Sequence, residues 1–85
     1  MEYSLYILYS QGGDRYYTGS SERPDRRLLF HNSKEKGFTA RFRPWEIVYL
    51  KKFPTKKLAR LAEKKIKSWK SKIMIERLIK GEVEL

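Results

Sequence analysis

Apolar and polar positions alternate through the first part of the chain, as they do in β-strands. Residues 3–9 follow a period of two, which places Tyr6 on the face opposite Leu5. Residues 11–14 contain two adjacent glycines and are typical of a turn, and residues 15–20 are rich in types that favour strands. The pattern therefore predicts a hairpin of two strands, at about 3–9 and 15–20.

Two further elements follow the hairpin. Pro24 suits the first turn of a helix and Asp25 adds negative charge near its N-terminus, which predicts a helix at about 24–34. Residues 45–52 predict a third strand, because Ile47–Leu50 form a continuous apolar stretch. Such stretches are typical of strands buried on both faces, so we expect this strand at the centre of the sheet.

The last third of the chain predicts two helices. Thr55 and Ser71 are suited to cap helices at about 55–69 and 71–80, within which apolar residues recur at helical spacing. The order strand, strand, helix, strand, helix, helix predicts an α+β fold, in which helices flank a three-stranded antiparallel sheet in two layers. Given its length, we expect the chain, residues 1–85, to form one domain.

Charge divides the chain into two unequal parts. Residues 1–33 hold four basic and four acidic side chains, whereas residues 34–85 hold sixteen basic and six acidic ones and so supply the whole net charge of +10. Such a surplus predicts attraction to a polyanion, with an affinity that falls as salt rises. We therefore expect DNA as the partner, although any single lysine can also belong to a merely solvated face.

The composition also excludes several classes of protein. The chain has no cysteine, so disulfides, thiolate zinc sites and cysteine catalysis are all excluded. It holds neither the basic and apolar regions of a signal peptide nor an apolar run of about 20 residues. We therefore expect a cytoplasmic protein without membrane contact, and a monomer.

Five side chains suggest a chemistry: Tyr6, Tyr17, Arg27, His31 and Glu63. Arg27 and His31 lie four residues apart in the predicted helix, so they share a face. Phosphodiester hydrolysis needs a deprotonated water, neutralisation of charge on the phosphate and a proton for the leaving oxygen. Glu63 suits one Mg²⁺ or Mn²⁺ ion that keeps several waters, and Arg27 suits a phosphate oxygen. We expect all five side chains to line one concave surface.

Five motifs, in order, resemble those of the GIY-YIG nuclease family. They are Tyr3–Leu8, Tyr17–Gly19, Arg26–Leu28, His31–Asn32 and Ala62–Trp69. The chain is most similar to small stand-alone bacterial members, which are similar to the nuclease module of the bacterial excinuclease. The resemblance extends from Tyr3 to about Ile79. It implies that Tyr6 accepts the proton of the attacking water, while His31 and Tyr17 orient or relay.

The chain departs from the family pattern at three places. The first triplet, usually Gly-Ile-Tyr, reads Ser4-Leu5-Tyr6, and Thr18 stands where isoleucine or valine is usual. Both changes keep the tyrosine, and the second keeps Gly19. Some members carry another histidine where this chain has Thr39, so any imidazole chemistry here must come from His31, the one histidine of the sequence.

Further residues are candidates for contacts with nucleic acid. Phe38 and Phe42 alternate with cations in a segment that has few other apolar residues, as in surfaces that stack bases while binding phosphates. An equally weighted alternative is that the two phenylalanines anchor this segment to the protein by hydrophobic contact. Trp45 and Trp69, by contrast, are predicted to be core residues. The full predicted set is Lys34, Lys36, Phe38, Arg41, Phe42, Arg43, Lys64 and Lys67.

Two functions from different classes remain. The first is a metal-dependent endonuclease that acts on DNA, at branched, damaged or flapped structures, because so small a module has little surface to read base sequence. The second is a nucleic-acid-binding module that kept the scaffold without the chemistry. Retention of Glu63 beside Tyr6 and Arg27 favours the enzyme, and a protein-interaction adaptor is a weaker third option.

Overall fold

The computed structural model describes residues 2–33 and 41–85. Its elements follow the predicted order and confirm the α+β class. They are β1 (Tyr3–Ser10), β2 (Arg15–Ser21), α1 (Pro24–Ser33), β3 (Glu46–Phe53), α2 (Lys56–Trp69) and α3 (Lys72–Ile79). In the part of the chain that the structure describes, no helix is long and apolar enough to span a membrane.

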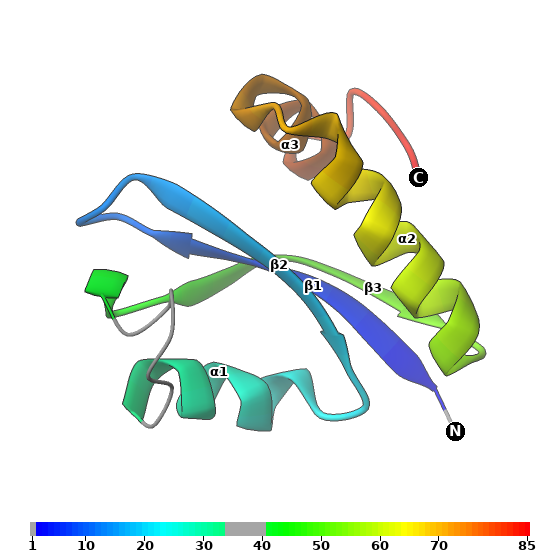
Figure 1. Cartoon of the computed structure of the whole chain (residues 1–85), viewed down its shortest axis with the longest axis horizontal. Helices are drawn as coiled ribbons and strands as arrows, with labels where there is room; N and C mark the ends of the chain where they lie inside the picture. Colours follow the sequence, from blue (N-terminus) through cyan, green and yellow to red (C-terminus); the bar gives the residue numbers. More distant parts are fainter. Residues whose placement is uncertain (1, 34–40) are drawn as a thin grey trace.

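The sheet has the strand order β2-β1-β3, and both pairs are antiparallel (Figure 1). The expectation that the strand at residues 45–52 lies at the centre is therefore wrong, because β3 is an edge strand and the side chain of Leu50 is 47% exposed. The central strand is β1, in which all residues from Ser4 to Leu8 are buried. Its neighbours supply partners on both edges, and helices cover both of its faces.

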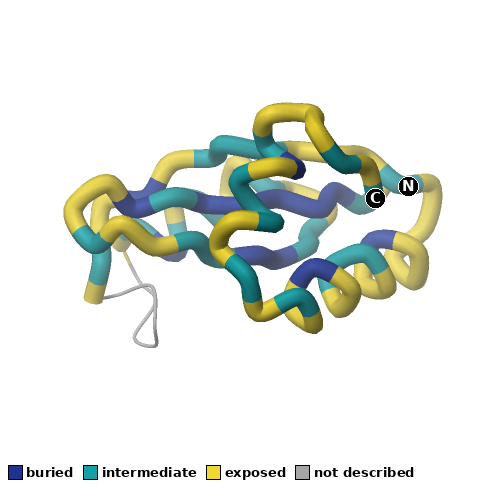
Figure 2. Tube along the Cα trace, turned by 90° about the horizontal axis from the view of Figure 1, so that it is seen from above, coloured by how far each residue is buried: buried dark blue, intermediate teal, exposed yellow. Residues whose placement is uncertain are grey.

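The helices lie on opposite faces of the sheet, α1 on one and α2 with α3 on the other (Figure 1). Leu5 and Ile7 of β1 pack with Ile66 and Leu78 on the α2 side. The alternate residues of β1 pack with Trp45 and with part of α1 on the other side. The protein thus has three layers rather than the two expected, and Figure 2 shows its buried residues concentrated along the strands.

The predicted helix caps are confirmed. The side-chain oxygen of Thr55 accepts a hydrogen bond from the backbone N–H of Leu58 at 3.2 Å, and Ser71 accepts one from Met74 at 3.2 Å. Each satisfies an N–H group that the first turn of a helix leaves without a partner. The caps therefore explain why α2 and α3 begin where they do.

The end of α1 is fastened to the start of β3. The side chain of Asn32 donates to the carbonyl oxygen of Trp45 at 3.0 Å and accepts from its N–H at 2.6 Å. Trp45 is 3% exposed and belongs to the core, as predicted. Asn32 thereby fixes where the chain returns to the sheet.

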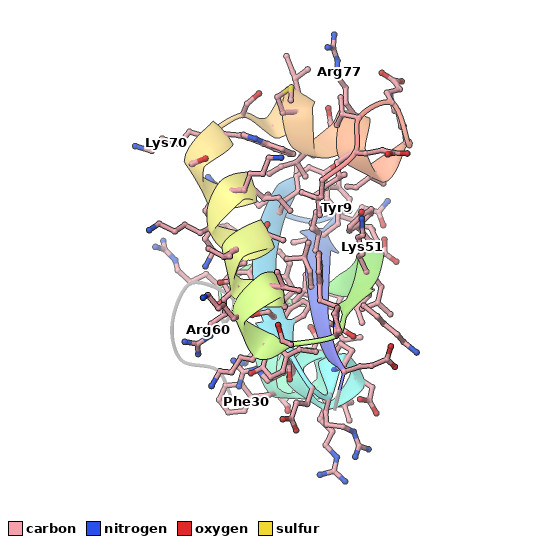
Figure 3. All side chains as sticks on the ribbon, turned by 90° about the vertical axis from the view of Figure 1, so that its right-hand side faces the viewer. Tyr9, Phe30, Lys51, Arg60, Lys70 and Arg77 are labelled. Atoms are coloured by element: carbon pink, nitrogen blue, oxygen red, sulfur yellow. The ribbon has the colours of Figure 1, made fainter. Side chains whose placement is uncertain are left out.

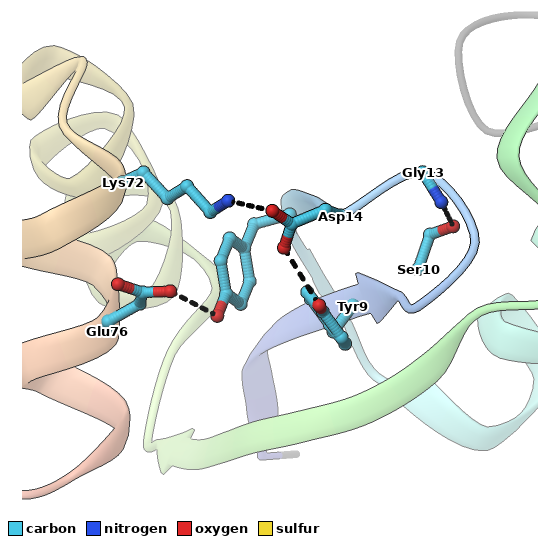
Figure 4. Close-up of polar contacts among 7 residues, drawn as sticks. Tyr9, Ser10, Gly13, Asp14, Lys72 and Glu76 are labelled. Atoms are coloured by element: carbon cyan, nitrogen blue, oxygen red, sulfur yellow. Dashed lines mark hydrogen bonds and ion pairs between the residues drawn. The ribbon is translucent and has the colours of Figure 1, made fainter.

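A polar cluster joins the β1–β2 hairpin to α3 (Figure 4). Asp14 accepts hydrogen bonds from the Tyr9 hydroxyl, at 2.8 Å, and from the Lys72 ammonium. The Tyr16 hydroxyl donates to Glu76 at 3.2 Å. These contacts hold α3 against the far end of the hairpin.

Candidate active site

A pocket of about 380 Å³ opens at the β2 edge of the sheet, where α1 and α2 approach each other from opposite faces. Four of the five predicted site residues line it, so the structure brings together side chains from β1, β2, α1 and α2. The lining residues are Tyr6, Tyr17, Gly19, Ser20, Arg27, Arg60, Glu63, Lys64 and Lys67.

Tyr6 reaches this pocket because Gly19 has no side chain. The two residues face each other across the β1–β2 pair, and a Cβ atom at Gly19 would lie 2.5 Å from the Tyr6 hydroxyl oxygen. The ring is otherwise enclosed, and only 1% of the residue is exposed. The Tyr6 hydroxyl therefore has one fixed position.

His31 does not line the pocket, so the expectation that it shares the concave surface is wrong. It is fully buried behind Tyr6, with its Nε2 atom 3.1 Å from the Tyr6 hydroxyl and its ring 4.8 Å from the ring of Tyr17. Arg27 and His31 do share a face of α1, but His31 is one turn further along the helix, where that face meets the sheet. His31 thus contacts Tyr6 and Tyr17, which line the pocket, without lining it itself.

The environment of Tyr6 keeps its phenol neutral. Burial raises the pKa of Tyr6, and a hydrogen bond to the Arg27 guanidinium opposes this effect without cancelling it. Tyr17 and Glu63 contribute further in the raising direction. Tyr6 therefore carries its proton at neutral pH.

Arg27 is positioned by its own helix. Its guanidinium carbon lies 4.7 Å from the centre of the Phe30 ring, one turn further along α1. This contact holds the planar group at the pocket, where two parallel N–H bonds can engage a phosphate.

Glu63 supplies the one carboxylate among the described residues that line the pocket. Its Oε1 atom accepts from the Ser20 hydroxyl at 2.7 Å, and its Oε2 atom accepts from the Lys67 ammonium at 2.7 Å. The Glu63 side chain is 21% exposed, against 52% for Lys67. The carboxylate is thus held by one partner from β2 and one from its own helix.

The donor set restricts which metal the pocket can hold. Among residues 2–33 and 41–85, no cluster of three or more His, Cys, Asp and Glu side chains could enclose an ion. A single carboxylate suits a hard cation such as Mg²⁺, which keeps several waters and takes further ligands from substrate phosphates. The lone carboxylate of Glu63 therefore fits a hard cation such as Mg²⁺ or Mn²⁺.

The predicted nucleic-acid contacts divide into three groups. Lys34, Lys36 and Phe38 lie outside the described residues. Lys64 and Lys67 line the pocket. The third group is Arg41–Arg43, whose members differ in their contacts.

Phe42 has packing contacts within the protein. It packs against the α1-side core, edge-on to Trp45 at 6.4 Å between ring centres, and it fills the space above Gly13. The guanidinium of Arg15 lies over its ring at 4.8 Å. The anchoring alternative therefore fits Phe42, while the exposed Arg41 stays a candidate for phosphate contact.

Arg43 also has a structural contact, because its Nε atom donates to the carbonyl oxygen of His31 at 2.8 Å. This bond satisfies a carbonyl group at the end of α1.

Three lining residues were not among the predicted site residues: Gly19, Ser20 and Arg60. Arg60 lies one helical turn before Lys64, so helical spacing could have identified it. Figure 3 shows Arg60 projecting outward from α2, away from the side on which Lys51 projects. No pattern marks Ser20, whose partner is 43 residues away.

The chain is similar to known proteins in both sequence and structure. A family model described as the GIY-YIG catalytic domain matches residues 2–77. The solution NMR structure of a UPF0213 protein from Bacillus halodurans is similar to the chain, with 31% sequence identity and a TM-score of 0.60. That match covers 94% of this chain and 84% of the other. A comparison with curated protein sequences gave no match.

Proposed function

Because the chain belongs to the family of GIY-YIG catalytic domains, a nuclease family, we propose that it is an endonuclease that hydrolyses phosphodiester bonds in DNA with one Mg²⁺ or Mn²⁺ ion. The observation that carries this proposal is the pocket at the β2 edge, which combines two phenols, a lone carboxylate and several cations. Nucleases of this family generally use divalent metal ions.

The charge of the pocket suits a phosphate. Four cations line it, from α1 and α2, against the single carboxylate of Glu63; they are Arg27, Arg60, Lys64 and Lys67. Arg27 is the one that Phe30 holds in place, so it binds the oxygen of the scissile phosphate. The cations of α2 are exposed and bind neighbouring phosphates of the backbone.

The chemistry divides between the ion and the protein. Glu63 would hold the ion, which when bound would neutralise charge on the phosphate and make a water more acidic. Tyr6 accepts the proton of the attacking water at its hydroxyl oxygen and passes its own proton to Nε2 of His31, 3.1 Å away, while the leaving oxygen takes a proton from solvent water. The transfer leaves Tyr6 neutral throughout, which agrees with its raised pKa. Tyr17 packs against His31 and keeps the imidazole in place.

The size of the site favours recognition of DNA shape over base sequence. The pocket of about 380 Å³ lies at one edge of a small sheet, and its polar side chains suit the sugar–phosphate backbone. We infer branched, damaged or flapped DNA as the substrate class.

Two observations favour a second function. Both oxygens of Glu63 are engaged by side chains of the protein itself, and burial raises the pKa of Tyr6. A nucleic-acid-binding module that performs no chemistry would have the same features. The cations of the pocket serve either function.

The test is cleavage of a panel of linear, flapped and branched DNAs in Mg²⁺, Mn²⁺ or a chelator. We expect cleavage by the wild type with a divalent ion only, and none by Glu63→Gln, which keeps the shape of the side chain. Both proteins should bind DNA with similar affinity, because binding is distributed over many cations. A wild type that binds every DNA and cleaves none would establish the binding module instead.

A further inference from the structure

Ser20 contacts the carboxylate that the proposed reaction depends on. It is part of β2, pairs with Leu5 and faces the α2 side of the sheet. Its hydroxyl donates to Oε1 of Glu63 at 2.7 Å, and Ser20 itself lines the pocket. The bond joins the sheet to the middle of α2.

The two partners of Glu63 differ in rigidity. Lys67 is a long, half-exposed side chain four residues further along the same helix, and exposed pairs of this kind contribute little to stability. Ser20 has a short side chain on a strand that is hydrogen-bonded to β1 along its length. Ser20 therefore fixes the carboxylate relative to Tyr6 and Tyr17, whereas Lys67 alone would allow it to move with α2.

We propose that Ser20 is a positioning residue for the metal ligand. Its hydroxyl holds Oε1 of Glu63, so that the carboxylate would be oriented for a divalent ion, while in this structure Oε2 accepts from the Lys67 ammonium. The inference rests on the proposed function, because it gives Glu63 the role of metal ligand. Partners that orient a metal ligand commonly change metal affinity or activity by about 10–100-fold when they are removed.

Three variants separate the hydroxyl from packing. Ser20→Ala removes the donor, and Ser20→Thr retains a hydroxyl at the same position. Ser68→Ala is the matched control, because the Ser68 hydroxyl is exposed and, among the described residues, bonds only to the carbonyl of Lys65 in its own helix. For each protein, Mn²⁺ affinity without DNA is measured by electron paramagnetic resonance, and the cleavage rate is measured as a function of Mn²⁺ concentration.

We expect Ser20→Ala to bind Mn²⁺ about 10-fold more weakly and to need a correspondingly higher Mn²⁺ concentration for half-maximal cleavage. Ser20→Thr and Ser68→Ala should resemble the wild type. DNA affinity in chelator should be the same for all four proteins, since the phosphate-binding cations are unchanged. Circular dichroism verifies that each variant is folded.

The outcomes distinguish this inference from the function on which it rests. Wild-type Mn²⁺ affinity in Ser20→Ala, with a wild type that cleaves, overturns the role of Ser20 and leaves the nuclease intact. An equal loss in Ser20→Thr also overturns it, because packing would then explain the effect. A 10-fold loss of Mn²⁺ affinity in Ser20→Ala supports the positioning role even if no DNA is cleaved, and in that case the nuclease function fails alone.

Discussion

Gly19→Ala is the substitution whose effect the structure defines most sharply. The added Cβ would lie 2.5 Å from the Tyr6 hydroxyl oxygen and 2.6 Å from its Cζ atom, about 1 Å inside ordinary contact. The Tyr6 ring is rigid and enclosed, so it cannot turn aside. Forcing an extra methyl group into a packed core costs about 1–3 kcal/mol. In a domain of this size each kcal/mol lowers the melting temperature by about 4–8 °C.

Relief of this overlap of about 1 Å requires the backbone to shift, which moves the Tyr6 hydroxyl away from the attacking water. A misplacement of that size can reduce a reaction rate about 10²-fold. Calorimetry and single-turnover cleavage of a flapped DNA measure the two effects, with Gly12→Ala as the control, because a Cβ there meets nothing within 4 Å. A Gly19→Ala protein with the melting temperature and cleavage rate of Gly12→Ala would show that our account of Gly19 and Tyr6 is wrong.

Three further variants test other parts of the structure. Burial and the nearby Glu76 carboxylate raise the pKa of Tyr16 from 10, its value in the unfolded chain, to about 12 in the folded protein. Tyr16 therefore stabilises the fold below pH 10, and this stabilisation is lost as the pH rises from 10 to 12. In urea titrations between pH 10 and 12, the free energy of unfolding of the wild type should fall by about 1–2 kcal/mol more than that of Tyr16→Phe. This value is below the full effect of the pKa shift, because the Tyr16 ring is only partly buried. Asn32→Ala should lower the melting temperature, because both bonds to Trp45 disappear at a cost of about 1–3 kcal/mol; unchanged melting would contradict their role. Replacing Arg60 and Lys64 with alanine should flatten the dependence of log DNA affinity on log salt by about 0.9 per lost phosphate contact, and an unchanged slope would place DNA elsewhere.

Local sequence patterns predicted the elements of this fold well. Period-two alternation identified the hairpin, and the capping residues Thr55 and Ser71 marked the starts of α2 and α3, because each of these signals depends on neighbours in sequence. Strand order was not predictable in this way. Ile47–Leu50 form a continuous apolar stretch on an edge strand, while the central position belongs to β1. Packing between segments that are distant in sequence decides which strand the helices cover on both faces.

The candidate site was predictable to a similar depth. Motif residues led to Tyr6, Tyr17, Arg27 and Glu63, all of which line the pocket. Helical spacing put His31 on the face of Arg27, but the period of a helix does not say which turn of that face meets the sheet. His31 therefore lies in the core, and its bond to the Tyr6 hydroxyl could be found only from the structure.

The position of the site follows from the three layers. Arg27 on α1 and Glu63 on α2 belong to helices on opposite faces of the sheet, so they can approach one another only around an edge strand. Because successive residues of a strand face opposite sides of the sheet, Gly19 of β2 lies on the α1 side and the side chain of Ser20 points to the α2 side. The absent side chain of Gly19 admits Tyr6, and the small side chain of Ser20 brings Glu63 to the same edge. A bulky residue at either position would separate the phenol from the carboxylate, so the chemistry we propose depends on these two small residues as much as on the charged ones.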